Sequence, residues 1–321
     1  MELDVVAMGE VLVQFNACTN GPLRHVVYFE KHAAGAEASF AIGMSRLGFK
    51  AGFITRVSND EFGKYILSVL RSEGLDVSRV KVDPEAPNGI YFIQRNYPIP
   101  GRSSVIYYRR GSAASRISTD DIDPDYIREA KLFHLTGITP ALSKSCRDAS
   151  FKALDIAHRS GVKISIDTNI RLRLWSGEDA KRTLIPMLKK ADIVLTERED
   201  AEILFGKKEP DEIAEEVLSM GAEVVAVKLG AEGAAAYTRK EKARKPAYKV
   251  PIVDVIGAGD AFAAGFIACL MNGKSLQEAL EVGNAAGALV VTVRGDYENM
   301  PSWEDIEKFL AAQRKETVIL R

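Results

Sequence analysis

The sequence predicts an α/β protein with a mainly parallel central sheet, helices on both faces of that sheet, and a small separate β-sheet. Three observations lead to this prediction. A chain of 321 residues is long enough for one large α/β domain with an appendage. Short apolar segments alternate with helical patterns from about residue 132 onward. An earlier group of segments has strand composition without any helical period.

The first third of the chain combines elements of both sheets. Residues 5–8 form a short apolar run that ends at Gly9 and Glu10, as a buried first strand would. Four later segments are rich in β-branched and aromatic residues and are separated by turn-forming stretches: 11–15, 26–29, 90–95 and 105–110. We expect these four to form the small sheet. Helical spacing with a glycine stop predicts two helices with a strand between them: 36–47, 61–73 and strand 51–54.

The rest of the chain alternates regularly. The predicted strands are 132–135, 163–166, 193–195 and 223–228, and the predicted helices are 143–159, 178–190, 199–205 and 210–220. This order implies right-handed crossovers and a parallel sheet covered on both faces. A hairpin of 234–237 and 247–250 would carry the basic run 239–245 at its tip, and three helices would follow: 258–270, 276–291 and 303–310.

The predicted elements divide the chain into two parts. We expect an α/β core of residues 1–10, 36–87 and 111–321. The discontinuous β-sheet of residues 11–35 and 88–110 would then stand beside this core.

Composition excludes several classes of protein. Hydrophobic residues make up 46% and charged residues 27%, as in ordinary globular proteins. Forty-three basic and 44 acidic residues give a net charge of -1, so nucleic acid is not expected as a partner. The three cysteines lack metal-ligand spacing and are expected to be reduced. An acidic N-terminus and the lack of a long apolar stretch predict a cytoplasmic protein without membrane attachment.

Two glycine-containing stretches imitate phosphate-binding loops. Residues 268–275 end in Gly-Lys-Ser like a Walker A loop, but Ala268 stands where the first glycine is needed and the preceding run is helical. We therefore expect a helix boundary there. Gly257-Ala258-Gly259 could open a dinucleotide fingerprint, but Phe262 replaces the third glycine and Asp260 would repel a pyrophosphate.

A third interpretation uses every residue of the stretch 257–260. The small side chains of Gly257, Ala258 and Gly259 would let the backbone N–H groups of a first helical turn approach an anion. Asp260, in the same turn, would then reach an acceptor hydroxyl as a general base. The same residues could also simply build a helix N-terminus, where aspartate is common.

The longer segment 254–266, DVIGAGDAFAAGF, closely resembles the C-terminal signature of the ribokinase, or PfkB, family of carbohydrate kinases. The order of elements along the whole chain is similar to that family, which implies a ribokinase-like fold. The resemblance also implies that the core binds nucleotide and substrate and that the small sheet is a lid. The resemblance implies that Asp260 activates the sugar hydroxyl and that the amides of residues 257–260 form the anion hole. It also implies ATP and Mg²⁺ as cofactors.

The resemblance extends to the nucleotide side of the site. The stretch 228–233, KLGAEG, is similar to the family loop that lies along the nucleotide, and the stretch 284–286 matches the border of the adenine pocket. The implied ATP-binding residues are Lys228, Gly230, Gly233, Gly257, Gly259 and Asn284.

Two positions depart from the family pattern. Ser39 stands where the N-terminal signature usually has an asparagine. The N-x-x-E motif, which organises magnesium through water, appears as 196–199, TERE. Thr196 replaces its asparagine, and Glu199 keeps the carboxylate that the resemblance assigns to indirect magnesium binding.

Within the family, the chain most resembles the archaeal 2-keto-3-deoxygluconate kinases, through the segments 21–24, 28–32, 89–95, 107–112, 167–171 and 174–175. The implied substrate-binding residues are Gly35, Tyr91, Tyr107, Arg109, Arg171 and Asp260. Arginine suits a keto acid because its guanidinium binds a carboxylate through paired hydrogen bonds. We expect the neighbouring Arg95 and Arg110 to be exposed strand residues.

The predicted activity is ATP-dependent phosphorylation of 2-keto-3-deoxygluconate at its terminal hydroxyl, giving the 6-phosphate, in the Entner-Doudoroff pathway. Preference between this sugar acid and its galactonate epimer stays open. One alternative is a family kinase for a ketohexose, ribose or a nucleoside, and a second is a non-catalytic sugar- or nucleotide-sensing protein. Because the family often pairs its lids, a homo-oligomer through lid residues such as Phe15, Tyr28 and Phe92 is expected.

Overall fold

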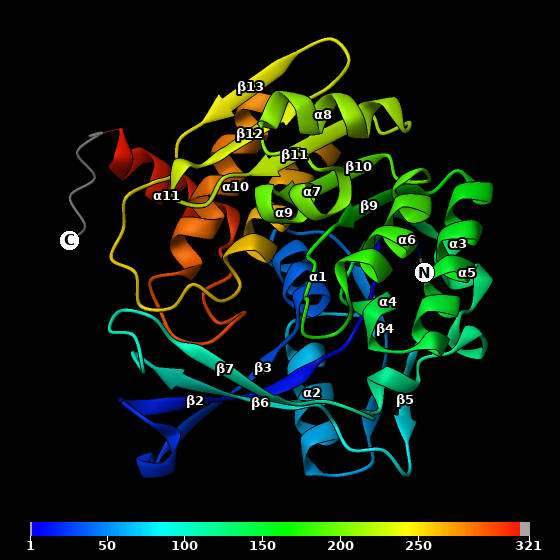
Figure 1. The fold of residues 1–321 in the computed structure, drawn as a ribbon. Helices are drawn as coiled ribbons and strands as arrows, with labels where there is room; N and C mark the ends of the chain where they lie inside the picture. The colour runs from blue at the N-terminus through cyan, green and yellow to red at the C-terminus, as the bar shows by residue number, and fades with distance from the viewer. Residues whose placement is uncertain (1, 315–321) are drawn as a thin grey trace.

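The computed structural model describes residues 2–314 and contains two β-sheets (Figure 1). The larger sheet has nine strands in the order β13-β12-β11-β10-β9-β8-β1-β4-β5. All neighbours from β11 to β5 pair in parallel, and β12 pairs antiparallel with both β11 and β13. Its strands are β1 Leu3–Met8, β4 Ala51–Ser58, β5 Val80–Asp83, β8 Ala130–Thr136, β9 Lys163–Asp167, β10 Ile193–Glu197, β11 Val224–Lys228, β12 Ala234–Tyr237 and β13 Lys242–Lys245. The predicted fold class is confirmed.

The smaller sheet has four strands in the order β3-β2-β6-β7 and lies below the core in Figure 1. Its strands are β2 Leu12–Asn20, β3 Phe29–Ala34, β6 Ile90–Arg95 and β7 Ser104–Tyr108. Strands β2 and β6 pair in parallel, although more than sixty residues separate them, and the outer strands pair antiparallel. We call this sheet, residues 12–34 and 90–108, the lid sheet.

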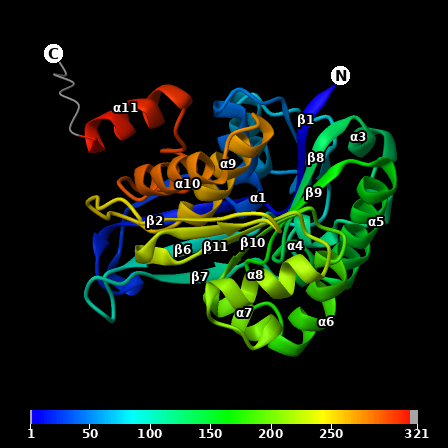
Figure 2. The same cartoon turned by 90° about the horizontal axis from the view of Figure 1, so that it is seen from above.

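Helices cover both faces of the large sheet. They are α1 Ala36–Arg46, α2 Glu61–Ser72, α3 Pro124–Arg128, α4 Thr139–Leu142, α5 Lys144–Ser160, α6 Gly177–Leu188, α7 Arg198–Phe205, α8 Pro210–Ser219, α9 Ala258–Met271, α10 Leu276–Val290 and α11 Trp303–Gln313. Figure 2 shows α1, α9, α10 and α11 on one face and α5 to α8 on the other. The central strands are therefore apolar on both faces, as the near-continuous hydrophobic runs predicted.

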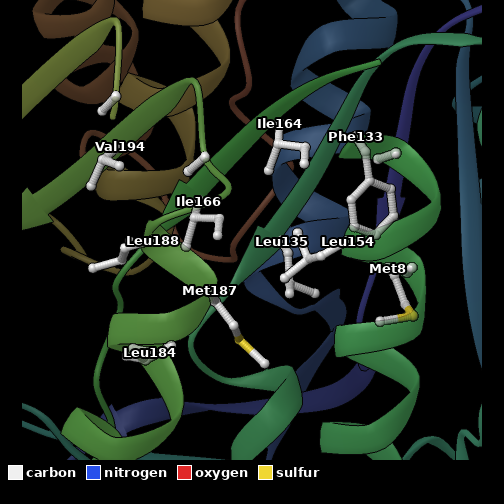
Figure 3. Close-up of a cluster of buried hydrophobic side chains, with 14 of the residues drawn as sticks. Met8, Phe133, Leu135, Leu154, Ile164, Ile166, Leu184, Met187, Leu188 and Val194 are labelled. Carbon is white, nitrogen blue, oxygen red and sulfur yellow. The ribbon is translucent and has the colours of Figure 1, made fainter. Parts of the chain in front are cut away.

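Two apolar cores follow from these two layers. Figure 3 shows the core beneath α5 and α6, where Phe133 and Leu135 of β8 lie near Leu154 of α5. Ile166 of β9 and Met187 of α6 belong to the same cluster. Burial of this many aliphatic side chains fixes the strand ends that carry the polar residues described below.

Two predicted strands were placed wrongly. The second lid strand covers Phe29–Ala34 instead of 26–29, because pairing with Leu12–Ala17 sets its register and leaves Val27 and Tyr28 each 75% exposed. The partner of β12 is Lys242–Lys245 instead of 247–250. Charged residues are common on edge strands, where they oppose pairing with other chains, so the basic run is itself a strand.

The Walker-like stretch is a helix boundary, as predicted. Helix α9 ends at Met271, and Gly273 has a φ of 68°. Ser275 caps α10, and Glu278 returns the hydrogen bond to its backbone. No phosphate loop forms within this boundary, because helices flank it on both sides.

Within residues 2–314, no helix is both long enough and apolar enough to span a bilayer. The three cysteines are free thiols, and Cys146 and Cys269 are buried. These findings agree with the expectation of packing cysteines.

Candidate active site

The carboxyl ends of the parallel strands gather charged side chains at one edge of the large sheet. Asp167, Glu197 and Lys228 are the last residues of β9, β10 and β11. The Lys228 Nζ atom lies 2.7 Å from Asp167 Oδ2 and 3.5 Å from Glu197 Oε1. Burial alone would lower the pKa of Lys228, but the two carboxylates outweigh it and raise that pKa. Lys228 therefore carries a positive charge at the centre of this cluster.

The turn at the start of α9 lies directly against Lys228. Gly257 is the N-cap of α9, with a φ of 80°, and Asp260 is in the first turn. A side-chain carbon at Gly259 would lie 3.3 Å from Lys228 Nζ and 3.8 Å from Glu197 Oε1. Backbone N–H groups of a first helical turn have no partner within the helix, so this turn can receive an anion beside a buried ammonium group.

The Asp260 carboxyl is enclosed by protein although part of the residue remains exposed. Burial raises the pKa of Asp260 well above its ordinary value, and the charges of Asp296 and Asp167 raise it further. Lys228 and Arg171 act in the opposite direction. A carboxylate with a raised pKa is a stronger base than an exposed one, which suits proton removal from a hydroxyl.

Asp296 belongs to the site but was not predicted. Its Oδ2 accepts a hydrogen bond from the Gly35 backbone at 3.1 Å, and its Oδ1 accepts one from the Ser39 hydroxyl at 2.9 Å. Its carbonyl oxygen would lie 2.6 Å from a side chain at Gly257. Asp296 thus joins the start of α1 to the start of α9, and Ser39, which replaces the family asparagine, has a defined structural partner.

The sequence offered little signal for Asp296. It follows Gly295 in an irregular segment between α10 and α11 and belongs to no recognised motif. Asp167 and Glu197 could have been found more easily. Asp167 directly follows the predicted strand 163–166, and Glu197 lies just beyond the predicted strand 193–195, at strand ends where ligand sites of open α/β sheets lie.

Gly35 is the N-cap of α1, and Tyr91 and Tyr107 lie on β6 and β7 of the lid sheet. Gly35 has a φ of 142°, and a side chain there would lie 2.2 Å from the Glu10 carbonyl oxygen, so only glycine fits. The Tyr91 hydroxyl accepts a hydrogen bond from the Gln14 amide at 2.5 Å and is buried. The Tyr91 and Tyr107 rings lie 5.2 Å apart, and Tyr107 is 41% exposed.

The two predicted substrate arginines differ in their surroundings. Arg109 lies just beyond the end of β7, and its Nε donates to Glu10 Oε2 at 2.8 Å. Its guanidinium also lies 5.4 Å from the centre of the Tyr107 ring. Arg171 is exposed in the loop after β9, and its charge lowers the pKa of Asp260 and of Asp167. Arg171 is therefore exposed, whereas Arg109 is held by an internal carboxylate.

The predicted ATP-binding residues separate into two groups. Gly233 and Asn284 come together around the segment 245–246: a side chain at Gly233 would meet the Lys245 carbonyl at 2.0 Å. The Asn284 amide donates to the carbonyls of Lys245 and Pro246 at 3.1 Å each. Gly230 begins the short 3-10 turn before Gly233, and Lys228 belongs to the acidic cluster described above.

Glu199 does not lie with these groups. It is exposed in the first turn of α7, where its charge acts on Arg198 and Lys208. The carboxylate of this motif that faces the catalytic turn is Glu197, because β10 ends there and directs it toward Lys228. Of the two carboxylates in this motif, Glu197 therefore lies beside Lys228, and the magnesium role of Glu199 stays a prediction.

Comparison with known proteins adds to this geometry. The pfkB family carbohydrate kinase description matches residues 2–303. A 2-dehydro-3-deoxygluconokinase of Thermoproteus tenax is 46% identical over 312 residues, which cover 97% of this chain and 95% of that protein. A protein of the same name from Bacillus subtilis is 39% identical over 317 residues, 98% of this chain and 97% of its own length.

A solved structure has the same fold. A putative ribokinase II from E. coli, in complex with ATP and Mg²⁺, is 30% identical and superposes with a TM-score of 0.90, covering 97% of this chain and 99% of its own. The site residues and these matches agree on a sugar kinase. The chain belongs to the pfkB family of carbohydrate kinases.

Proposed function

We propose that this chain transfers the γ-phosphoryl group of ATP to the terminal hydroxyl of 2-keto-3-deoxygluconate, also called 2-dehydro-3-deoxygluconate, to give the 6-phosphate. The observation that carries the proposal is the position of Asp260 in the first turn of α9, within electrostatic range of Lys228 and Arg171. The names of the Thermoproteus tenax and Bacillus subtilis relatives support the choice of substrate. Such a reaction belongs to the Entner-Doudoroff pathway.

In the proposed reaction, Asp260 takes the proton of the terminal hydroxyl while that oxygen attacks the γ-phosphorus. The bond between the γ-phosphorus and the bridging oxygen breaks, and ADP leaves. The backbone N–H groups of Gly257, Ala258, Gly259 and Asp260 would hold the negative charge of the transferring group. Lys228, with its raised pKa, would add a fixed positive charge beside it.

ATP would extend from this turn toward the second group of residues. Gly230 and Gly233 form a tight turn that lets the backbone approach a ligand, and Asn284 fixes the neighbouring segment 245–246. We propose that these residues border the nucleotide.

Magnesium fits the acidic cluster. The carboxylates of Glu197 and Asp167 supply the oxygen donors that Mg²⁺ prefers, and Mg²⁺ usually keeps several waters. Among residues 2–314, no group of three or more His, Cys, Asp or Glu side chains forms a direct metal site. When bound, the ion would neutralise phosphate charge. We propose that Glu197 shares the indirect, water-mediated role expected of Glu199.

The carboxylate of the sugar acid would face the arginines. We propose that Arg171, which is exposed and carries a permanent charge, faces this carboxylate, while Tyr91, Tyr107 and Gly35 would line the sugar chain. Arg109 would contribute once substrate competes with Glu10 for its guanidinium. We propose that the lid, residues 11–35 and 88–110, closes over the core, residues 1–10, 36–87 and 111–321, and excludes water.

A substrate panel tests the proposal. Purified protein would be assayed for ATP consumption with 2-keto-3-deoxygluconate, its galactonate epimer, fructose, ribose and adenosine. We expect kcat/KM to be highest for the 2-keto-3-deoxy acids. The ratio of the kcat/KM values for the two epimers would show how strictly the enzyme distinguishes between them. A preference for a neutral sugar would refute the role of the arginines, and ATP binding without turnover would indicate a sensing protein.

We also propose that the chain forms a homo-oligomer through the lid sheet. Phe15 and Phe92 stack on each other with ring centres 5.1 Å apart and are half-buried. They therefore offer less exposed surface to the proposed interface than expected. Tyr28 and Tyr108 are 75% and 63% exposed and offer apolar surface at the same sheet. Light scattering of the protein and of a Tyr108→Glu variant should show a dimer and a monomer, respectively. If wild type and variant were both monomers, the proposed interface would be refuted.

A further inference from the structure

Arg95 is buried, although the sequence predicted an exposed strand residue. It is the last residue of β6, shares a strand face with Tyr91 and Ile93, and is only 7% exposed. Its guanidinium crosses from the lid sheet to the segment that precedes the anion hole. One guanidinium nitrogen donates to the Val253 carbonyl at 2.8 Å, and the other lies 3.5 Å from Asp254 Oδ2.

A chain of hydrogen bonds continues from Arg95 toward the sugar side. Arg95 donates to Asn16 Oδ1 at 3.0 Å, and the Asn16 amide donates to Asp254 at 3.2 Å and to Gln14 at 3.3 Å. Gln14 in turn donates to the Tyr91 hydroxyl at 2.5 Å. Every member of this chain is buried. The proposed sugar contact Tyr91 is thus connected to the beginning of the catalytic segment.

An apolar contact joins the same two regions. Ile256 packs against a cluster of buried lid residues, Leu12, Ala34, Tyr91 and Ile93. Ile256 directly precedes Gly257, the N-cap of α9. The lid sheet therefore contacts the segment 253–256 through polar and apolar groups together.

The segment 253–256 has few other supports. Ile252, Val253 and Val255 are 69%, 41% and 66% exposed. On the side away from the lid, the backbone N–H groups of Val253 and Asp254 donate to the Val291 carbonyl at 2.8 and 3.2 Å. Contacts at the end of α10 and contacts with the lid sheet therefore hold this segment from two sides.

We propose that Arg95 is a positioning residue for phosphoryl transfer. Arg95 couples the position of the lid sheet on the core to the position of the anion hole. This inference rests on the proposed function of the turn 257–260. Arg95 fixes the carbonyl of Val253 and neutralises Asp254, a buried carboxylate that would otherwise repel an incoming phosphate. It touches neither reacting group and acts through the backbone that leads to Gly257.

The test compares Arg95→Met, Arg95→Lys and the control Arg102→Met, which removes an exposed arginine from the hairpin tip of the same sheet. Because a displacement of about 1 Å in a reacting group costs about a hundredfold, Arg95→Met should lower kcat about 10- to 100-fold. The KM values for ATP and for the sugar should both stay within about threefold of wild type, since the ground-state contacts with both substrates remain. Arg95→Lys should recover part of the rate, because it keeps the charge but offers fewer hydrogen bonds. Arg102→Met should behave as wild type.

A double variant separates an effect on positioning from a loss of folding. Arg95→Met leaves Asp254 buried without its cation, whereas Arg95→Met/Asp254→Asn removes both charges and should fold normally. We expect the double variant to be as slow as Arg95→Met. A folded double variant with wild-type kcat would overturn the proposal, as would a change confined to the sugar KM.

Hydrogen exchange separates this inference from the proposed function, because it requires no substrate. Backbone amides of residues 253–260 should exchange faster in Arg95→Met than in wild type, and Arg102→Met should leave them unchanged. If the wild type phosphorylates a different sugar, the kinetic comparison is made with that sugar and the exchange result still applies. Unchanged exchange at 253–260 would show that Arg95 does not position the turn, whatever the substrate is.

Discussion

The proposed catalytic turn and the proposed sugar-binding side of the site are built in opposite ways. The turn is one continuous stretch, 254–260, in which local helix geometry places the anion hole and Asp260 together. The sugar side collects single residues from separate segments: Gly35, Tyr91, Tyr107, Arg109 and Arg171. Only tertiary contacts bring those residues together, including the hydrogen bond that joins Gly35 to Asp296.

This difference assigns different tasks to the two regions. Groups in a helical turn keep their relative positions as long as the helix forms, so the turn suits the step that every family member must perform. Residues on separate elements can change one at a time, so the sugar side suits selectivity. Substitutions in the turn should therefore lower kcat, whereas those on the sugar side should raise the KM for the sugar acid.

The largest effect is expected from Asp260→Asn. Removal of a general base typically costs on the order of a hundred- to ten-thousandfold in rate, so kcat should fall by that factor. Asparagine has nearly the same shape, so the affinity for ATP measured by calorimetry should hardly change. Asp125→Asn, at an exposed position of α3, is the control. An Asp260→Asn enzyme with near-normal kcat would remove the basis of the proposed mechanism.

A glycine substitution tests whether the backbone of the turn matters as much as its carboxylate. Gly257 and Gly161 have similar positive φ values of 80° and 71°, so alanine should cost about 1 kcal/mol of stability at either site. At Gly257 the new side chain would also lie 2.6 Å from the Asp296 carbonyl oxygen, whereas nothing lies within 4 Å of Gly161.

Gly257→Ala should therefore displace the turn and lower kcat about a hundredfold, while Gly161→Ala should only lower the melting temperature. Steady-state kinetics and thermal unfolding of both variants provide the measurement. If both variants had wild-type kcat, the anion hole would not depend on this close approach.

The same contrast explains how much of the site the sequence could predict. The position of the turn at the start of a helix was predicted correctly, since its residues are neighbours and small side chains at a helix N-terminus have a direct physical meaning. The roles of its amides and of Asp260 stay predictions. The fold class followed from strand and helix periodicity, because strands buried on both faces must be apolar. Both predictions depend on local information.

Predictions failed where the surroundings of a residue depend on contacts with residues that are distant in the sequence. Arg95 looks like an exposed strand residue until its partner Asp254, far along the chain, is placed beside it. Asp296 carries no motif, and its role depends on hydrogen bonds to Gly35 and Ser39. Spacing alone also did not indicate that Glu197 ends β10 and lies beside Lys228.

Arg171→Gln tests the sugar side. A hydrogen bond to a charged group contributes about 1.5 to 3 kcal/mol, so the KM for 2-keto-3-deoxygluconate should rise about 10- to 100-fold. The kcat should change much less, and activity with neutral sugars should not fall. Arg128→Gln, which removes an exposed arginine from α3, is the matched control. Equal losses for acidic and neutral sugars would argue that Arg171 does not bind the carboxylate.

The smallest effect is expected at a contact that holds the lid sheet to the segment containing Asp296. His32 of β3 lies 2.6 Å from Glu298 and 3.7 Å from Glu30, and Glu30 also pairs with Arg294 at 2.9 Å. Burial alone would lower the pKa of His32, but the hydrogen bond to Glu298 and the charges of both glutamates raise it. The folded protein therefore binds the proton more tightly than the unfolded chain.

This pKa shift fixes the sign of the pH dependence. The contribution of His32 to stability is complete below its unfolded pKa of about 6.5 and is lost as the pH rises through the higher folded value. The unfolding free energies of wild type and His32→Gln should differ by on the order of 1 kcal/mol at pH 6 and by less at pH 9. Urea unfolding at the two pH values measures this difference, and kcat should stay near wild type because the catalytic turn is unchanged. A difference that is the same at both pH values would show that His32 contributes by packing alone.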